Sequence, residues 1–458
     1  MSNPKLQIIP PKAVQQALHA LNAAGFEAYI VGGCVRDALR GAEPHDWDCT
    51  TNAKPQEICA CFQGYHVIET GLQHGTVTVV IDHMPIEITT YRIDGVYADH
   101  RRPDSVTFTD SLTDDLARRD FTVNAMAFHP ERGLIDPFHG ADDLQARRIT
   151  CVGKAEDRFD EDGLRILRGM RFASVLDFAI APETADAIHA KNTLLHHISA
   201  ERIDVELTKL LCGKGAERVL TEYADVLFTV LPELAPMHHF DQKNPHHDYD
   251  VYTHTLKAVA ACPPEPILRW AALLHDSGKP HTFTEDERGG HFYGHAAISA
   301  EIAARALKSM KCDRKRYDRV LVLVQKHDIV MNGTAKQLKR IVRQIGEEAA
   351  EQFLLLHKAD VTAQAACHRA ERIAESDRLL EMLAELRAQD ACMSIKKLAV
   401  NGSDLMAAGV PQGRAIGETL NRLLDAVMDG TLPNEKDALM QAVVQNRDSQ
   451  GSDPAQQA

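Results

Sequence analysis

The spacing of apolar residues changes near residue 112, and this change limits the folds open to the chain. Before it, short apolar runs predict a helix over 12–24 and strands over 26–31, 46–50 and 74–92, the last with a turn near Asp82. After it, apolar residues recur at spacings of three and four almost to the end, which is typical of helices. The sequence therefore predicts an α+β fold, in which a head with a sheet precedes a long helical region.

Length, charge and cysteine content exclude several classes of protein. A chain of 458 residues is too long for one core, and its net charge of -14 argues against a protein that coats nucleic acid by bulk charge. The ten cysteines are scattered without a CxxC pair, which favours reduced thiols over a disulfide framework. We find no apolar run of about 18 residues and no signal-peptide pattern, so we expect a cytoplasmic protein with no membrane partner.

Two aspartates lie shortly after a Gly-Gly turn in the segment VGGCVRDALRGAEPHDWDCTT, residues 31–51. On a strand, Asp46 and Asp48 point to the same face, where two carboxylates are unfavourable unless a cation lies between them. Glu87 lies between Ile86 and Ile88 and is expected to point away from the core. Three carboxylates on neighbouring strands suit Mg²⁺ and two-metal phosphoryl transfer, although an exposed loop with ordinary surface acids is the alternative.

Further motifs follow in a fixed order. They are LARRDFTVNAMAF (116–128), LIDPFHGADDL (134–144), RFDEDGLRILRGMRFA (158–173) and ISAERIDVELTKLL (198–211). Together with the Gly-Gly segment, the set closely resembles the class II tRNA nucleotidyltransferases, which add CCA to tRNA 3′ ends, and their poly(A) polymerase relatives. The resemblance covers roughly residues 25–211 and extends more weakly to about 440. It implies a polymerase-β-like head with a small mixed sheet, tRNA, CTP and ATP as partners, and Mg²⁺ in the head.

The resemblance also implies roles for particular residues of the head. The triphosphate would be bound by Gly32, Gly33, Arg36 and Asp37. The catalytic metals would be held by Asp46 and Asp48, with Glu87 as a further ligand or as the base. Ribose recognition would fall to Arg119, Asp120 and Asn124. Backbone N–H groups of a glycine turn at a helix start suit phosphate, which agrees with the first of these roles.

The EDxxR segment would select C and then A without a nucleic-acid template. It corresponds to Glu161, Asp162 and Arg165. If the segment is one helix, Asp162 and Arg165 lie three residues apart on one face, where an acceptor and a donor fork can meet a base edge. A surface salt bridge is the alternative. Arg168 and Arg171 are expected to help, either at the triphosphate or in helix packing.

The segment RIDGVYADHRRPDSVTF (92–108) resembles the flexible loop that full CCA-adding enzymes carry and CC-adding relatives lack. An ordinary exposed loop is the alternative. Poly(A) polymerases of this superfamily usually carry a basic C-terminal extension, whereas this chain ends polar and acidic. These observations favour full CCA addition, with CC-adding, A-adding and poly(A) polymerase activities left open.

Histidines and aspartates recur in the helical region with a second recognisable order. The pattern His, His-Asp, His, Asp resembles the HD phosphohydrolases, whose metal ligands would be His254, His275, Asp276 and Asp360. His295 and His327 would complete a second metal site. The resemblance implies a divalent metal and hydrolysis of 2′,3′-cyclic phosphates, while a degenerate HD fold kept as a tRNA-binding scaffold is the alternative.

A basic stretch stands out within the acidic chain. Residues 301–343 hold 12 Lys or Arg against 4 Asp or Glu. Contacts to tRNA phosphates are predicted there, at Arg314, Lys315, Arg316, Lys336, Lys339, Arg340 and Arg343. Solvated helix faces are the alternative.

These features predict five segments along the chain. They are a nucleotidyltransferase head (1–145), a helical neck with the nucleotide-selecting template (146–240), an HD domain (241–365), a tRNA-binding helical tail (366–445) and a disordered end (446–458). Two functions of other classes remain as alternatives: an HD phosphohydrolase with a regulatory head, and an RNA-binding scaffold with both sites inactive.

Overall fold

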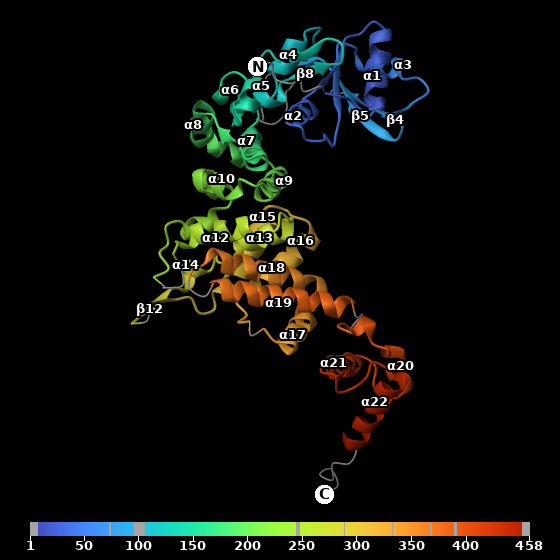
Figure 1. The fold of residues 1–458 in the computed structure, drawn as a ribbon, viewed down its shortest axis with the longest axis vertical. Helices are drawn as coiled ribbons and strands as arrows, with labels where there is room; N and C mark the ends of the chain where they lie inside the picture. Colours follow the sequence, from blue (N-terminus) through green and yellow to red (C-terminus); the bar gives the residue numbers. More distant parts are fainter. Residues whose placement is uncertain are drawn as a thin grey trace. The chain divides into compact units, whose positions relative to one another are not determined.

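The chain forms two compact units in the computed structural model (Figure 1). The structure describes residues 8–72, 75–95, 106–243, 248–287, 289–331, 333–366, 369–388 and 392–450. The first unit runs up to Ala235 and includes Ser309–Cys312, and the second holds the rest.

A seven-stranded sheet forms the centre of the head, with strand order β3-β4-β5-β2-β1-β8-β9. Its strands are β1 (Ala28–Val31), β2 (Asp48–Thr51), β3 (His66–Ile68), β4 (Thr76–Ile81), β5 (Met84–Thr90), β8 (Ala127–His129) and β9 (Gly133–Ile135). β2 and β5 pair in parallel and the other neighbours are antiparallel, so the mixed sheet is confirmed. The predicted turn between β4 and β5 lies at Asp82 and His83, both with positive φ.

Two details of the predicted strands were wrong. β8 and β9 lie in a region that we predicted to be helical, because strands of three residues are too short to show alternation. Pairing with β1 decides their conformation instead. In addition, the predicted strand over 46–50 begins only at Asp48, so Asp46 precedes it.

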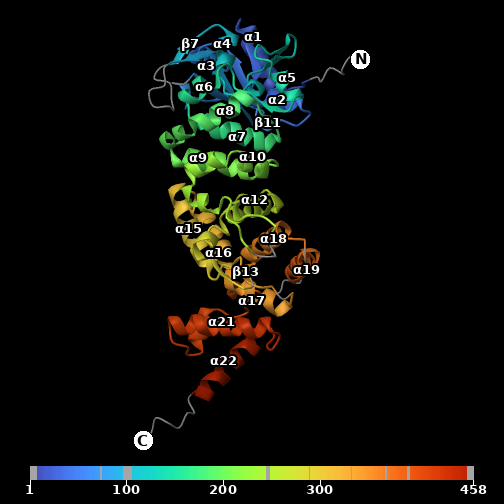
Figure 2. The same cartoon turned by 90° about the vertical axis from the view of Figure 1, so that its left-hand side faces the viewer.

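Helices pack against the strands of the head (Figure 2). They are α1 (Lys12–Ala23), α2 (Gly33–Leu39), α3 (Pro55–Cys61), α4 (Leu112–Ala117), the 3-10 turn η2 (Thr122–Asn124) and α5 (Gly140–Gln145). Tyr29 and Val31 of β1 join Tyr91 and Leu116 in one core cluster, which ties α4 to that face of the sheet. A short antiparallel ribbon, β6 (Arg92–Asp94) with β7 (Val106–Phe108), frames the loop predicted over 92–108, whose residues 96–105 lie outside the described residues.

The rest of the first unit is mainly helical. Its elements are β10 (Arg148–Ile149), α6 (Ala155–Glu161), α7 (Leu164–Leu176), β11 (Ala179–Ile180), α8 (Pro182–Lys191), η3 (Asn192–His197), α9 (Ala200–Leu211), α10 (Ala216–Glu222), α11 (Ala224–Val230) and η4 (Pro232–Met237). The single helix expected through the EDxxR segment was wrong. Asp162 is extended, with φ -141° and ψ 104°, and Gly163 is the N-cap of α7, so α6 and α7 meet at a break.

The second unit is a helical bundle followed by smaller helices, which confirms the predicted helical region. Its elements are α12 (Val251–Ala261), α13 (Pro266–Leu274), α14 (Lys279–Thr282), β12 (Thr284–Asp286), β13 (Gly289–His291), α15 (His295–Ser309), α16 (Arg314–Lys326), α17 (Ala335–Ile345), α18 (Glu347–Ala363), α19 (Arg369–Ala388), η5 (Ile395–Lys397), α20 (Gly402–Ala407), α21 (Arg414–Met428) and α22 (Lys436–Gln450). α12, α13, α16 and α18 pack against one another.

The end of the chain differs from the prediction. α20, α21 and α22 share a hydrophobic cluster of their own, centred on Leu405, Leu424 and Leu439. α22 continues to Gln450, so residues 446–450 are helical rather than disordered. None of the helices in the described residues combines the length and the apolar character needed to cross a bilayer.

Candidate functional sites

The parallel pairing of β2 with β5 brings the head carboxylates together. Asp48 lies directly opposite Glu87 in the strand register. Trp47 is buried between Asp46 and Asp48, and both carboxylates are exposed. Glu87 is likewise exposed between two buried isoleucines, as predicted. Asp48 and Glu87 therefore lie side by side on one face of the sheet, and Asp46 is exposed two residues before β2.

The electrostatics of this face favour a cation. Asp48 keeps exposed surface, but its partial desolvation, together with the negative charges of Glu87 and Asp46, raises its pKa to about 6, and the charge of Arg119 opposes this shift. Like charges held this close destabilise the ionised form unless a positive charge is added. Carboxylate oxygens bind hard divalent cations, so Asp46, Asp48 and Glu87 suit the Mg²⁺ that the motifs imply.

Asp115 is a residue that the sequence analysis missed. Its side chain is fully buried beneath the sheet and accepts hydrogen bonds from Thr50 Oγ1 at 3.1 Å and from Arg118 Nε at 2.9 Å. It also lies 3.6 Å from Arg119 Nη2. Asp115 thereby positions Arg119 beside Gly32. In the sequence it looks like an ordinary acid in the first turn of a helix, so no local signal identified it.

The Gly-Gly turn brings the backbone close to Arg119. Gly32 has φ 83°, which favours glycine, and a Cβ there would lie 3.1 Å from Arg119 Nη1. Gly33 is the first residue of α2, as expected for a strand-turn-helix. The backbone around the predicted triphosphate site is therefore shaped to keep this guanidinium close.

A chain of hydrogen bonds joins the predicted triphosphate and ribose residues. Arg36 forks onto Asp37 at 2.8 and 2.9 Å and donates to Asn124 Oδ1 at 2.6 Å. Asn124 in turn donates to Asp120 Oδ1 at 3.1 Å, and Arg168 donates to Asp120 Oδ2 at 2.6 and 2.8 Å. Side chains from three separate motifs thus form one network.

The negative charge of Asp120, at the centre of this network, is strongly stabilised. Burial alone would raise the pKa of Asp120, but Arg168, the Asn124 hydrogen bond and the charge of Arg165 together outweigh it and hold that pKa at about 2. Arg171, the other predicted helper, lies over the ring of Phe172 and 2.7 Å from Glu206. The contacts of Arg171 are those of helix packing, while Arg168 connects α7 to the ribose motif.

The three EDxxR residues lie close together but pair differently from the prediction. Arg165 is buried and bonds to Glu161 and to the backbone oxygens of Arg158 and Arg118, both at 3.1 Å. Asp162 instead faces Arg202 of α9, whose Nη2 lies 2.8 Å from Oδ2. The sequence analysis assigned no role to Arg202. Because the partners are 40 residues apart, only the packing of α7 against α9 reveals the pair.

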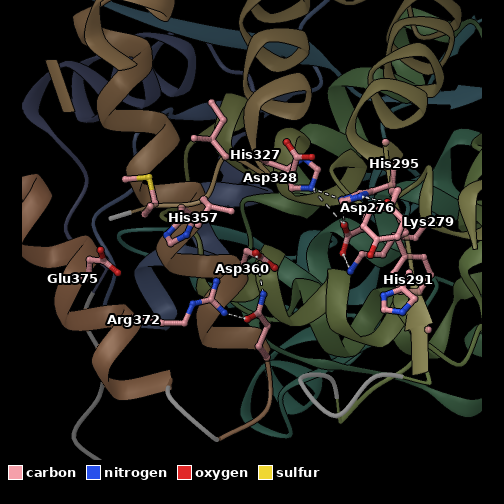
Figure 3. A pocket seen from close by; sticks show the side chains of 18 residues that line it. Asp276, Lys279, His291, His295, His327, Asp328, His357, Asp360, Arg372 and Glu375 are labelled. Atoms are coloured by element: carbon pink, nitrogen blue, oxygen red, sulfur yellow. Dashed lines mark hydrogen bonds and ion pairs between the residues drawn. The ribbon is translucent and has the colours of Figure 1, made fainter. Parts of the chain in front are cut away.

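A second cluster of ionisable side chains lies in the helical unit (Figure 3). The structure groups the predicted ligands into two overlapping sets, His254, His275, Asp276 and Asp360, and Asp276, His295 and His327. Nε2 of His254 lies 2.9 Å from Asp360 Oδ1, and Nε2 of His275 lies 3.2 Å from Asp276 Oδ2. On the other side of Asp276, Oδ1 lies 3.5 Å from both His295 and His327. Asp276 is thus shared by both sets.

The outward nitrogens of these imidazoles are already engaged. In His275 and in His327, Nδ1 lies 2.7 Å from the backbone oxygen of another residue. In His295 the corresponding distance is 2.8 Å. A backbone oxygen can only accept, so Nδ1 carries a proton and Nε2 is the nitrogen that faces the cluster and can bind a metal once it has no proton. Nε2 of His295 and Nε2 of His327 then face each other at 3.0 Å. Lone pairs at this distance repel unless a proton or a cation lies between them.

Burial and charge at this cluster also fit a cation. Burial lowers the pKa of His275, but Asp276 and Asp360 outweigh it and raise that pKa to about 10. The charges of His275 and Lys279 hold the pKa of Asp276 well below its usual range despite burial. His275 Nε2 lies between the two carboxylates, 3.2 Å from Asp276 Oδ2 and 3.6 Å from Asp360 Oδ1. Imidazole and carboxylate ligands held this way suit a divalent metal.

The cluster opens into a pocket of about 460 Å³. Figure 3 shows its two sides, with Asp276, Lys279, His291 and His295 on one and His357, Asp360 and Arg372 on the other. Lys279 Nζ lies 2.8 Å from Asp276 Oδ2. Arg372 is bonded to Gln364, whose amide donates to Asp360 Oδ2 at 3.2 Å. The sequence analysis singled out neither cation, although Lys279 follows the His-Asp pair closely.

The predicted tRNA contacts divide into two groups. Lys315, Lys336 and Arg340 are exposed, as is Arg314, which pairs with Asp318 at 2.8 Å. Arg343 is also exposed and pairs with Asp425. Two others have internal roles: Arg316 is buried over the Trp270 ring, and Lys339 donates to the backbone oxygen of Met428. The exposed group keeps its cations available to a phosphate backbone.

Comparison with protein families matches three stretches of the chain. Residues 28–150 match the poly A polymerase head domain. Residues 177–237 match an RNA- and SrmB-binding site of polymerase A, and residues 291–443 match the tRNA nucleotidyltransferase domain 2 family.

Whole-chain relatives are similar throughout. A CCA-adding enzyme of Levilactobacillus brevis is 36% identical over 93% of this chain and 96% of its own length. A CCA-adding enzyme of Streptococcus thermophilus is 34% identical over 94% of this chain and 96% of its own length. Among solved structures, the Bacillus stearothermophilus CCA-adding enzyme in complex with CTP is 30% identical, with a TM-score of 0.74 over 97% of this chain and 99% of that chain.

Proposed function

Because the chain belongs to the CCA-adding enzymes, which extend the 3′ end of tRNA from CTP and ATP, we propose that the paired carboxylates of β2 and β5 carry out this reaction. The observation that carries the proposal is the register of Asp48 opposite Glu87, with the negative charge of Asp46 close by. The reaction joins the tRNA 3′-oxygen to the α-phosphorus of CTP or ATP and releases pyrophosphate. Mg²⁺, when bound, neutralises charge on the triphosphate and makes the 3′-hydroxyl more acidic.

The chain's own residues orient the reacting groups. Asp46 and Asp48 would hold the cation, and Glu87 would be a third ligand or accept the proton of the 3′-hydroxyl. Arg119, kept in place by Asp115, faces the Gly32 turn where the phosphates would lie. The network from Arg36 through Asn124 and Asp120 to Arg168 would fix the ribose and triphosphate relative to the neck.

Nucleotide selection falls to the break between α6 and α7. Arg165 is held by Glu161 and two backbone oxygens, so its guanidinium has a fixed direction. Asp162 leaves the helix and meets Arg202. We propose that these side chains read the Watson–Crick edge of cytosine and then of adenine, and that Arg202 contributes to this reading through Asp162.

The segments take corresponding roles in this proposal. The head spans 1–145, the template-bearing neck 146–240, the HD domain 241–365 and the tRNA-binding tail 366–445. The exposed cations Arg314, Lys315, Lys336 and Arg340 would contact tRNA phosphates, and the enzyme would act in the cytoplasm, where tRNA ends are matured.

One assay tests the head assignment and the extent of addition together. The protein is incubated with tRNA lacking CCA and with CTP alone, ATP alone or both, and the 3′ ends are sequenced. Full CCA addition gives CC with CTP alone and CCA with both nucleotides. Ends that stop at CC with both nucleotides, or that carry A tracts, would assign CC-adding or poly(A) polymerase activity instead.

The helical cluster supports a second activity, metal-dependent phosphohydrolysis of a 2′,3′-cyclic phosphate. The observation favouring it is the convergence of imidazole Nε2 atoms on Asp276 and Asp360, with their Nδ1 atoms bonded to backbone oxygens. In the reaction, water oxygen bonds to phosphorus, one ester P–O bond breaks, and the water proton passes to the released ribose oxygen. A divalent metal, when bound, polarises the phosphoryl oxygen and acidifies that water.

Hydrolysis of adenosine 2′,3′-cyclic phosphate with Mn²⁺, Ni²⁺ or Mg²⁺ tests this second activity. The expected result is release of the adenosine monophosphate and its loss after chelation. A protein that binds no metal and hydrolyses no cyclic phosphate would show instead that the cluster is a structural remnant.

A further inference from the structure

An exposed aromatic side chain stands at the metal pocket of the helical unit. Tyr293 lines this pocket and is 79% exposed. Val330, which lines the same pocket, is 85% exposed. Among the described residues, these two are the most exposed of the large apolar side chains. Single exposed apolar residues are common, but two beside one polar pocket leave an unusual apolar surface next to the ionisable cluster.

The ring of Tyr293 rests on a second ring. His291 lies parallel to it, with centroids 5.4 Å apart and an interplanar angle of 15°. His291 is itself fixed, because its Nε2 lies 2.9 Å from Asp286 Oδ1. One face of the tyrosine is therefore supported, while its high exposure leaves the remainder of the ring accessible.

The hairpin that carries His291 is locked in place. Gly290 N donates to the backbone oxygen of Lys243 at 2.8 Å. A Cβ at Gly290 would lie 2.2 Å from the backbone oxygen of Gln242, so only glycine permits this approach. Lys243 Nζ also pairs with Glu285 at 2.9 Å. The support beneath Tyr293 is thus part of a packed element.

The same pocket combines this surface with groups that suit a phosphate. Lys279 and Arg372 supply positive charge near the ligand cluster, each anchored by a glutamine: Lys279 Nζ donates to Gln242 Oε1 at 2.9 Å, and Arg372 bonds to Gln364. The pocket volume of about 460 Å³ is within the usual range for small-molecule sites. A ligand with a flat apolar end and an anionic end matches both parts.

We propose that Tyr293, supported by His291, stacks on the nucleobase of the substrate whose phosphate reaches the His/Asp cluster. The substrate class is therefore a nucleotide, either a nucleoside 2′,3′-cyclic phosphate or the last nucleotide of an RNA that carries one. Aromatic stacking tolerates every base, so the platform recognises a nucleotide end without choosing its sequence. This inference rests on the proposed phosphohydrolase activity and adds the side chain that would hold the base of its substrate.

The test compares a cyclic phosphate that has a base with one that lacks it. Adenosine 2′,3′-cyclic phosphate and glycerol 1,2-cyclic phosphate are hydrolysed by the wild type, Tyr293→Ala and Tyr293→Phe. For the nucleotide, Tyr293→Ala should raise KM by about 5- to 100-fold, the loss expected for one stacked base. Hydrolysis of the glycerol compound should stay unchanged, and Tyr293→Phe should behave as the wild type. Tyr65→Ala is the matched control, since Tyr65 is an exposed tyrosine of the head.

Two results of this assay would overturn the platform while the hydrolase stands. One is an equal loss of hydrolysis on both substrates in Tyr293→Ala, which would mean that Tyr293 has a structural role. The other is no change on either substrate, which would leave the exposed ring to a macromolecular partner.

A binding measurement keeps the platform testable if the wild type hydrolyses neither compound and the proposed activity fails. Stacking quenches the fluorescence of 1,N6-ethenoadenosine 3′-monophosphate, so this probe is titrated into metal-free protein. Quenching that persists in Tyr293→Phe and disappears in Tyr293→Ala supports the platform. Quenching that is absent, or equal in Tyr293→Ala, overturns it.

Discussion

The two candidate metal sites of this chain are built in opposite ways. Asp46, Asp48 and Glu87 are exposed carboxylates beside a pair of strands, whereas His254 and His275 are fully buried and their imidazoles point inward. The helical site fixes its imidazoles through backbone oxygens, while the head site relies on strand register alone. An open carboxylate face suits a cation that arrives with its nucleotide, and a buried imidazole cluster suits one that stays bound between turnovers.

Removing one head carboxylate should give the largest effect. Asp48→Ala is expected to lower CCA addition by at least about 1,000-fold, because a metal supplies several kcal/mol of transition-state stabilisation. Binding of tRNA, followed by gel shift, should change little. Activity above a few per cent of wild type would show that the head does not depend on this carboxylate. Asp82→Ala, at the exposed turn between β4 and β5, is the control.

Removing two ligands of the helical cluster should separate the activities of the two sites. His275→Ala combined with Asp276→Ala should lower hydrolysis of the cyclic phosphate by at least about 100-fold and lower the bound metal measured after dialysis, since half of a four-ligand set is lost. CCA addition should stay within about twofold, as the head keeps all its ligands.

The control for that variant is His19→Ala, which removes an exposed imidazole of α1. If the double variant loses CCA addition while circular dichroism shows an intact fold, the helical site serves tRNA positioning and the separation of two centres is wrong. Asp276→Asn repeats the test with less loss of packing.

A substitution in the template should change nucleotide choice more than rate. Arg165→Ala is expected to relax discrimination against UTP and GTP by about 10- to 100-fold, the value of a bidentate base contact. Competition between labelled nucleotides on one tRNA measures this ratio. Arg202→Ala should give a smaller relaxation in the same direction, because it acts through Asp162. Unchanged nucleotide choice in Arg165→Ala would make Arg165 a packing residue.

The smallest expected difference between the head site and the helical site is the pH dependence of metal binding. This measurement compares the two sites directly. Asp48, with a pKa near 6, is already ionised at pH 7.5, so the head should release almost no proton on binding Mg²⁺ and should lose affinity only below pH 6. His275, with a pKa near 10, is protonated at pH 7.5 in the metal-free protein. Binding Mn²⁺ there should release about one proton, and affinity should rise with pH through this range.

Calorimetry in two buffers of different ionisation enthalpy counts these protons. His275→Ala isolates the head, and Asp46→Ala with Asp48→Ala isolates the helical site. Equal proton release by the two isolated sites would contradict the contrast between them.

The sequence reveals the head carboxylates because strand alternation is local. Ile86 and Ile88 identify the buried face of β5, which leaves Glu87 on the other face without any knowledge of its neighbours. The same local rule failed for β8, because a strand of three residues is too short to show alternation. Helical spacing failed for Asp162, because Asp162 and Gly163 separate α6 from α7.

Residues whose importance comes only from tertiary contacts were not predicted. Asp115 is fully buried and bonds to Thr50 of β2, whereas its pair with Arg118 is an ordinary contact three residues apart on α4 that does not indicate burial. Arg202 gains its partner only when α7 packs on α9. In the helical unit, the order of histidines predicted the ligand set, but the stack of Tyr293 on His291 requires the hairpin to be folded.

The parallel pairing of β2 with β5 also has an evolutionary consequence. The connection between them contains α3, β3 and β4, and its loops can gain or lose residues without moving either carboxylate. A single-residue deletion inside β5 is different, because it would shift the register by one and turn Glu87 into the core. Lineages of this enzyme should therefore vary in length between Thr51 and Thr76, while the spacing from Met84 to Thr90 stays constant.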